Sequence, residues 1–229
     1  MEKAKMLKYI FSIATLLVAF TTFAQKPDRH QLLLGVDLSR FVVPILDSTR
    51  FGWEVSADYE LLNDMYVNVE IGSQNTRFKT AGYHYNAAGA YTRLGVDYNF
   101  MKHVDEESTD KLLVGFRYGF STFYHEADQI TLSDEIWGEL SNQEVERNWL
   151  TANWVEATTG MRARLINNFY MGWTIRFRVR LWLQKDKIME PYHIPGYGRA
   201  WNNSWVGVNY SLYYQIPLFK KKSQIPGEK

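Results

Sequence analysis

One stretch, Phe169–Leu183 (FYMGWTIRFRVRLWL), constrains the fold of this chain more than any other. Its side chains alternate between an apolar set and a second set that holds Arg176, Arg178 and Arg180. A period of two places the two sets on opposite faces of a β-strand, whereas a helix would spread both sets around its circumference. The stretch is therefore predicted to be a strand with one apolar face and one face of arginines that need partners.

The same alternation recurs along the chain. The predicted strands are Gln31–Val43, Phe51–Leu62, Met65–Lys79, Tyr91–Phe100, Lys111–Glu126, Trp154–Ile166, Phe169–Leu183 and Trp205–Phe219. Asn63-Asp64 and Asn167-Asn168 are turn sequences of the kind that join antiparallel neighbours. Longer connections follow the odd-numbered strands and shorter ones follow the even-numbered strands, which is typical of an outer-membrane barrel. The sequence thus predicts an all-β fold, an eight-stranded antiparallel transmembrane β-barrel.

Three connections differ in composition from the strands. Thr80–Ala90 is rich in glycine and alanine and is predicted to be a loop. Ala127–Asn153 is the longest predicted break and is acidic, and Ser133 could start a short helix within it. The segment after Gln184 is predicted to be a loop rich in proline, glycine and aromatic residues. No repeat or linker indicates a second domain.

Alternation alone does not distinguish a membrane barrel from a soluble lipocalin-like barrel, which would place its apolar set inside. The glycines of the predicted strands share the polar face: Gly35, Gly52, Gly72, Gly95, Gly115, Gly119, Gly160, Gly172 and Gly207. Glycine weakens a water-exposed strand and does not improve its packing. Inside a narrow barrel, however, small residues make room for arginine side chains. The charged set is therefore predicted to line the interior.

Acids and arginines balance on this inner face. The predicted interior charge network comprises Asp37, Glu54, Asp58, Glu60, Glu70, Asp97, Glu156, Arg93, Arg117, Arg162, Arg164, Arg176, Arg178 and Arg180. A buried guanidinium without a partner is costly, and side chains alone fill the interior of an eight-stranded barrel. We therefore expect mutually paired charges and a plugged core. A charged conduit or an anion site is the alternative interpretation.

The two ends of the chain suggest export. Residues 1–24 combine a basic start, the apolar run Tyr9–Phe23 and a small-residue exit, which predicts a signal peptide cleaved before Gln25; an uncleaved anchor helix is the alternative. The barrel is expected to occupy residues 25–219. The basic tail, residues 220–229, is expected to lie at the inner headgroups, where lysines are attracted to anionic lipid. The chain has no cysteine, which excludes a lipoprotein and any disulfide framework.

The composition argues against nucleic-acid binding and is typical of a protein that contacts a membrane. The chain has 26 basic and 25 acidic residues, and this near-neutrality argues against nucleic-acid binding, which needs a basic surplus. Tryptophan and tyrosine are abundant, as they are where a membrane wall meets the headgroup layers. Residues expected to mark these aromatic belts are Trp53, Tyr59, Phe100, Phe169 and Tyr214.

No motif for catalysis, cofactor binding or metal binding was identified. The five histidines do not stand at a metal-ligand spacing. A hydrolase triad at the outer rim, built from His125 or His193 with a serine and a carboxylate, is an alternative function that would act on membrane lipid. A narrow pore is a further alternative. The prediction is a non-enzymatic protein without a cofactor.

Two loops are interpreted as candidate surfaces for protein partners. The acidic loop Asp128–Arg147 carries apolar residues, and the stiffened loop Pro191–Trp201 carries aromatic ones. The residues singled out are Ile136, Trp137, Leu140, Tyr192, Tyr197 and Trp201. Folding of either loop onto the barrel is the alternative interpretation.

The predicted mature chain, with its Ala24-Gln25 junction, eight strands and a final strand ending in YSLYYQIPLF, resembles the outer-membrane β-barrel families of Bacteroidota, over almost everything after residue 30. It is most similar to their small uncharacterised families, of domain-of-unknown-function standing. It departs from the usual carboxy-terminal insertion signal by Pro217 and by ten residues after Phe219. The resemblance implies an outer-membrane location with both termini periplasmic, and contact with membrane lipid and lipopolysaccharide. It also implies envelope protein partners, as for an accessory subunit of an outer-membrane assembly or export machine.

Overall fold

The structure is a computed structural model. It describes residues 31–79, 83–101, 110–134, 138–186 and 189–218. The predicted signal peptide (1–24), the predicted basic tail (220–229), Ile136 and Trp137 lie outside the described residues.

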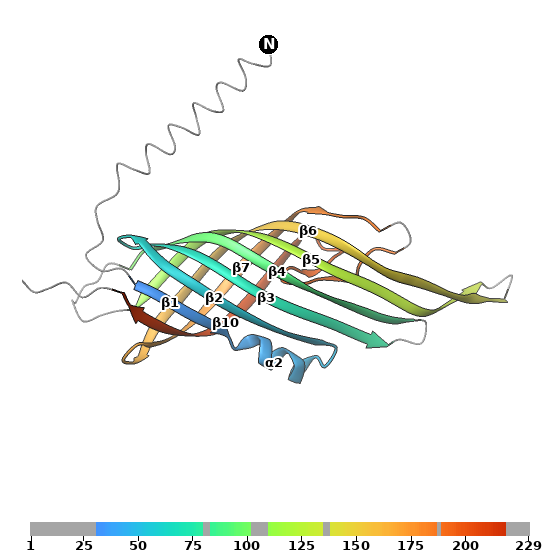
Figure 1. The fold of residues 1–229 in the computed structure, drawn as a ribbon, viewed down its shortest axis with the longest axis horizontal. Helices are drawn as coiled ribbons and strands as arrows, with labels where there is room; N and C mark the ends of the chain where they lie inside the picture. The colour runs from blue at the N-terminus through green and yellow to red at the C-terminus, as the bar shows by residue number, and fades with distance from the viewer. Residues whose placement is uncertain (1–30, 80–82, 102–109, 135–137, 187–188, 219–229) are drawn as a thin grey trace, which may run out of the picture.

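Within the described residues, eight strands form one closed antiparallel barrel (Figure 1). They are β1 (Gln31–Asp37), β2 (Arg50–Leu62), β3 (Met65–Lys79), β4 (His84–Asn99), β5 (Lys111–Asp134), β6 (Gly138–Ile166), β7 (Phe169–Leu183) and β10 (Ser204–Pro217). The order around the barrel is β1-β10-β7-β6-β5-β4-β3-β2, and β1 closes the ring by pairing with both β10 and β2. The predicted eight-stranded antiparallel barrel is confirmed.

The two ends of the barrel differ. Tight turns join β2 to β3 and β6 to β7, and Asp64 and Asn167 in them adopt positive φ angles of 64° and 46°, which Asp and Asn tolerate. We call this end, where β1 also begins and β10 ends, the turn end. The opposite end carries the helix α2 (Ser39–Leu46) and the longer connections, and we call it the loop end (Figure 1).

The first strand is shorter than the predicted segment Gln31–Val43. It ends at Asp37, whose carboxylate accepts hydrogen bonds from the Ser39 backbone N–H (2.9 Å) and hydroxyl (2.5 Å). Such local side-chain bonds compete with strand pairing, and the chain continues as α2 with Pro44 inside the helix. The prediction of strand beyond Asp37 was therefore wrong.

The fourth strand is longer than predicted, because β4 begins at His84 inside the expected loop Thr80–Ala90. Its small residues pair with both neighbouring strands, with Ala90 opposite Ser73 of β3. Gly89 lies so close to Phe123 of β5 that a Cβ atom there would overlap it. The glycine and alanine residues of this segment are thus explained by close packing between β4 and β5, although they are also typical of a loop.

The predicted break Ala127–Asn153 is largely a hairpin. β5 continues to Asp134 and β6 begins at Gly138, so that the pair extends beyond the other strands (Figure 1). Ser133 lies in β5, which contradicts the short helix predicted there. The register shifts three times between His125 and Leu132. Bulges of this kind disrupt the period of two and hide a strand in the sequence.

Burial is inverted relative to a soluble protein. On β4, Arg93 and Asp97 point inward and are at most 2% exposed, whereas Leu94 and Val96 point outward and are 55% and 47% exposed. Glycines make space on the inner face, as predicted: Gly119, for example, lies under the ring of Trp154. The barrel therefore has a charged core and an apolar outer wall.

The connection between β7 and β10 is more ordered than a loop. It contains two short strands, β8 (His193–Ile194) and β9 (Gly198–Arg199), which pair as a small hairpin. Gly196 and Gly198 in this hairpin have φ angles of +79° and +132°, which suit glycine. We call residues 189–203 the plug, because they fill the loop end of the lumen, as described below.

Candidate functional site

Glu70 of β3 lies at the centre of the interior charge network. Its carboxylate accepts a hydrogen bond from Arg93 Nη1 (2.5 Å) and two from Arg176, from Nη1 (2.8 Å) and Nη2 (2.9 Å). Arg117 Nε donates a further bond of 2.9 Å. One carboxylate therefore connects strands β4, β5 and β7 across the lumen, in the bidentate geometry that arginine favours.

Two further acids surround the same arginines nearer the loop end. Glu54 accepts hydrogen bonds from Arg93 Nη1 (2.9 Å) and Arg40 Nη2 (2.8 Å). Glu156 lies 3.0 Å from Arg93 Nε and 3.2 Å from Arg178 Nε. Arg93 and Glu156 are completely buried. Because each of these charges has more than one partner, the ion pairs form one continuous network that connects strands across the lumen.

Toward the turn end the pairs are more separate. Arg117 holds both oxygens of Asp97, at 3.0 and 2.8 Å. Arg162 Nη2 lies 2.6 Å from Asp58 Oδ2, and its guanidinium stacks over the ring of Tyr213 at 4.3 Å. These contacts extend the network of paired side chains toward the turn end.

Asp37 and Glu60 are the remaining predicted acids, and both are buried. Asp37 pairs with Arg40 Nε at 3.4 Å. The predicted network does not include Arg40, because the sequence pattern predicts a strand where the structure has α2. The Asp37-x-Ser39 spacing, a frequent turn signal, is the pattern in the sequence that could have revealed this change of direction.

The positions of Arg180 and Arg164 differ from the predicted place in the interior network. Arg180 is half-buried and donates hydrogen bonds to the Ala200 carbonyl and to Asn203 Oδ1 (2.7 Å), both in the plug. Arg164 is exposed, so its prediction as an interior residue was wrong. Arg164 pairs with Tyr170 near the end of β6, directly before the register shift and the turn that end the strand.

Arginines of the network also hold the plug in place. Arg93 Nη2 donates to the Gly196 carbonyl at 3.0 Å, and Arg178 Nη1 donates to the Tyr197 carbonyl at 2.9 Å. Gly196 lies directly against the ring of Tyr91, where a Cβ atom would overlap it. The plug and the charge network are thus one connected interior structure.

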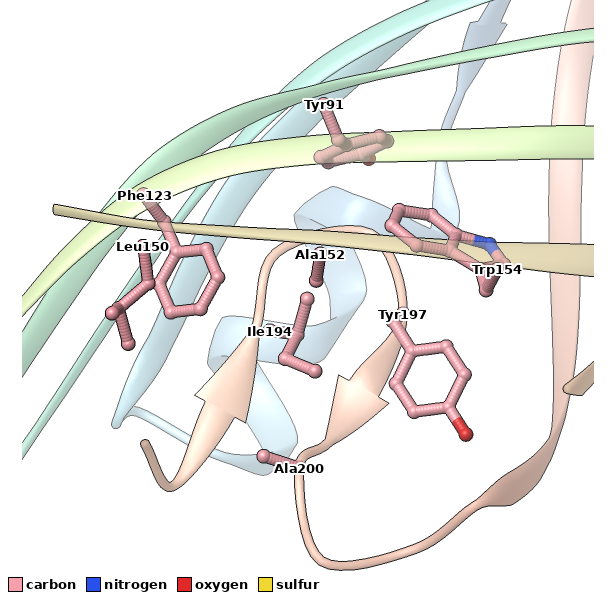
Figure 2. Packing of buried hydrophobic residues seen from close by; sticks show 8 residues of the cluster. All are labelled: Tyr91, Phe123, Leu150, Ala152, Trp154, Ile194, Tyr197 and Ala200. Atoms are coloured by element: carbon pink, nitrogen blue, oxygen red, sulfur yellow. The ribbon is translucent and has the colours of Figure 1, made fainter. Parts of the chain in front are cut away.

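An apolar cluster seals the plug against the wall (Figure 2). Ile194 and Tyr197 of the plug are fully buried among side chains of β4, β5 and β6. The ring centroids of Tyr197 and Trp154 lie 5.8 Å apart. The eight residues of the cluster are Tyr91, Phe123, Leu150, Ala152, Trp154, Ile194, Tyr197 and Ala200.

The plug changes the interpretation of the predicted partner loops. Tyr197 is buried, which contradicts its assignment to an accessible partner surface. Tyr192 is partly buried and its ring lies 4.7 Å from Phe78 and 4.8 Å from Trp201. Trp201 is 52% exposed, and Leu140 lies in β6 of the outer hairpin. The second loop therefore folds mainly into the barrel, because its apolar residues find a buried site there.

His193 of the plug is buried without a charge. Burial lowers its pKa to about 3, and the positive charges of Arg50 and Arg40 act in the same direction. The imidazole is therefore neutral at neutral pH. A neutral ring can be buried beside these arginines without placing another positive charge in the plug.

His125 forms a dyad with Asp186, with 2.9 Å between Nε2 and Oδ2. The same oxygen accepts a hydrogen bond from Asn148 (2.7 Å). In a hydrolase triad the other side of the ring would contact a nucleophile. Nδ1 of His125 has no hydrogen-bond partner among the described residues. The geometry thus brings together two members of a triad, and the contacts support a structural dyad between β5 and the loop after β7.

In the part of the chain that the structure describes, no group of three or more histidine, aspartate or glutamate side chains could hold a metal ion. No helix in these segments is long and apolar enough to span a membrane.

Several solved structures have similar folds. A major outer membrane protein from Thermus thermophilus has a TM-score of 0.46 and 10% identity, covering 82% of this chain and 98% of that chain. The N-terminal β-barrel domain of Pseudomonas aeruginosa OprF has a TM-score of 0.37 and 10% identity, with coverage of 82% and 98%. Ail, the attachment invasion locus protein of Yersinia pestis, has a TM-score of 0.38 and 10% identity, with coverage of 82% and 99%. No functional property of these proteins is transferred at this level of similarity.

Among curated proteins, none matches this sequence. A family model described as "Domain of unknown function (DUF6048)" matches residues 6–221, which is most of the chain. The predicted resemblance to a family of domain-of-unknown-function standing agrees with this match. The chain therefore belongs to the DUF6048 family.

Proposed function

We propose that this protein is a non-conducting, non-enzymatic outer-membrane β-barrel that acts through protein partners. The inverted burial is the observation that carries the membrane assignment. Large apolar side chains cover the outside of the strands while arginines are buried inside, and an apolar wall of this kind is stable in lipid and unfavourable in water. Both termini are inferred to lie in the periplasm, at the turn end, and the loop end to face outward.

The sealed lumen supports a function other than transport. The charge network crosses the lumen around Glu70, and the plug closes the loop end with a buried apolar cluster. A diffusing solute would have to break several charge-assisted hydrogen bonds at once, and each such bond is stronger than a neutral one. We infer that the surface, and not the interior, carries the function.

The outer hairpin of β5 and β6 supports protein partners. The pairing of β6 with β7 ends at Ala152 opposite Leu183, and the Gln184 N–H donates one further hydrogen bond to the Thr151 carbonyl. Residues 138–150 of β6 have β5 as their one neighbouring strand among the described residues. A cleft of about 650 Å³ lies beside this edge and is lined by residues 144–148 of β6 and 184–186 after β7. Free strand edges recruit extended segments of other chains. We propose an accessory subunit of an outer-membrane assembly or export machine, in contact with lipid and lipopolysaccharide.

Affinity purification from gently solubilised native membranes tests this function. We expect the tagged protein to recover the same envelope proteins in stoichiometric amounts, because the free edge of β6 offers backbone donors and acceptors to a partner. A variant lacking residues 130–143 should lose them while the barrel remains folded. Gly207→Ala, a conservative change inside the barrel, is the matched control and should retain them. A barrel recovered alone in every sample would contradict the proposal.

A further inference from the structure

The wall of the barrel has a seam that no strand closes. β1 separates β2 from β10, but its pairing ends with Asp37 opposite Ser211 on one side and Val36 opposite Val55 on the other. Beyond these pairs, residues 50–54 of β2 and 204–210 of β10 continue toward the loop end. Within the described residues, these two edges have no barrel strand between them. We call this gap the seam.

The seam lies in the apolar part of the wall. Phe51 and Trp53 on one side of it are 60% and 43% exposed, and Val206 and Val208 on the other are 57% and 66% exposed. Unpaired backbone groups facing hydrocarbon cost several kcal/mol each. A barrel crossing a membrane with this seam open would therefore be unfavourable, and some other element must cover it.

Helix α2 occupies this position. It contacts both β2 and β10, and the N–H of Leu38, just before the helix, donates to the Tyr210 carbonyl at 2.8 Å. Arg40 turns into the lumen, where it pairs with Glu54 at 2.8 Å and with Asp37 at 3.4 Å. The polar side of the helix is thus fixed to the interior charge network. Figure 1 shows α2 alongside the barrel next to β2.

The opposite side of α2 is apolar and uncovered. Phe41, Val42 and Ile45 are 49%, 50% and 82% exposed, and their spacing places them on one face of the helix. Helix α2 contacts β2, whose apolar residues Phe51 and Trp53 are also exposed on the outside of the barrel. This contact indicates that whatever surrounds the barrel wall also covers α2.

The length of β1 agrees with this arrangement. Its seven residues, tilted as barrel strands are, span about 17 Å, which is less than an apolar band of about 25 Å. The eight residues of α2 are about 12 Å long. Together they are long enough to cross the band, although β1 alone is not.

We propose that α2 is a lipid-facing part of the barrel wall that seals the seam. Phe41, Val42 and Ile45 insert among the acyl chains of the leaflet at the loop end, while Arg40 anchors the helix from inside through Glu54. This inference rests on the proposed membrane location. The occupant of the apolar face is lipid hydrocarbon, and neither a second copy of the chain nor a protein partner.

Single-cysteine labelling tests the proposal directly, because the chain has no cysteine of its own. A small fluorophore would be attached to Ile45→Cys or Phe41→Cys on α2. Val96→Cys on the outer wall of β4 is the lipid-facing control, and Ser48→Cys in the exposed turn after α2 is the water-facing control. The full-length mature protein would be refolded into phosphatidylcholine vesicles with brominated acyl chains, and folding checked by heat-modifiable electrophoretic mobility.

We expect brominated lipid to quench the labels at Ile45 and Phe41 as strongly as the label at Val96. Their quenching should be several-fold stronger than that of the label at Ser48. If aqueous iodide quenched the α2 labels while brominated lipid quenched the label at Val96, α2 would face water. This result would contradict the lipid-facing helix and would still agree with the proposed membrane location. Protection of α2 from both quenchers would indicate a protein cover and would also overturn it. Absence of lipid quenching at Val96 would instead contradict the proposed membrane location.

Discussion

Replacing Glu70 with alanine is expected to destabilise the barrel by about 3–5 kcal/mol, the range for breaking a buried ion pair. Glu70 accepts hydrogen bonds from Arg93, Arg117 and Arg176, and all four residues are buried. Its removal leaves three guanidinium groups with fewer partners in a lumen that water enters poorly. The free energy of unfolding should be measured by urea titration in detergent micelles, with tryptophan fluorescence as the signal.

The matched control is Glu146→Ala, which removes an exposed carboxylate from the outer hairpin. Substitutions at exposed sites of this kind usually change stability by no more than about 0.5 kcal/mol. If Glu70→Ala and Glu146→Ala unfolded at the same urea concentration as the unmodified protein, the charge network would not be the structure that stabilises the interior.

The second large effect is expected for Gly119→Ala. A Cβ atom at Gly119 would overlap the indole ring of Trp154, which is fully buried and donates a 2.6 Å hydrogen bond to Glu156. The ring has no free space to move into, so the substitution should cost about 1–3 kcal/mol, the usual range for overpacking. The same urea titration measures it, and lower electrophoretic heat stability should accompany the change.

Gly207→Ala provides the comparison, because it adds the same methyl group to the same inner face. There the nearest atom is Arg178 Nη2 at 3.1 Å, at the end of a flexible side chain. Its effect should be clearly smaller than that of Gly119→Ala. Equal effects of the two substitutions would show that the loss of glycine itself, and not contact with Trp154, determines stability.

The sequence predicted the closed barrel well, because an apolar outer wall and a charged lumen impose opposite demands on alternate residues. This constraint gave the eight strands, the turns at Asp64 and Asn167 and the positions of most interior charges. The prediction of strands fails outside the region where side chains alternate between the outer wall and the lumen. In the outer hairpin, register shifts between His125 and Leu132 break the alternation, so the sequence pattern predicts a loop there.

Long-range contacts explain the other differences. The plug folds inward because Arg93 and Arg178 donate to its carbonyls and because Tyr197 is buried against Trp154. None of these pairings has a signal in local sequence. Likewise, Arg40 enters the network only because the chain turns at Asp37 into a helix. A balance of acids and arginines in the sequence does not identify the partners, which depend on the three-dimensional arrangement.

Electrical recording in planar lipid bilayers tests the central claim, a membrane barrel with a sealed interior, most directly. Insertion would first be verified by flotation of the protein with liposomes, and an open-channel porin in the same chamber would serve as the positive control. The paired lumen around Glu70 and the plug predict no steady current above that of the bare bilayer. Reproducible single-channel currents from the inserted, unmodified protein would contradict the sealed interior.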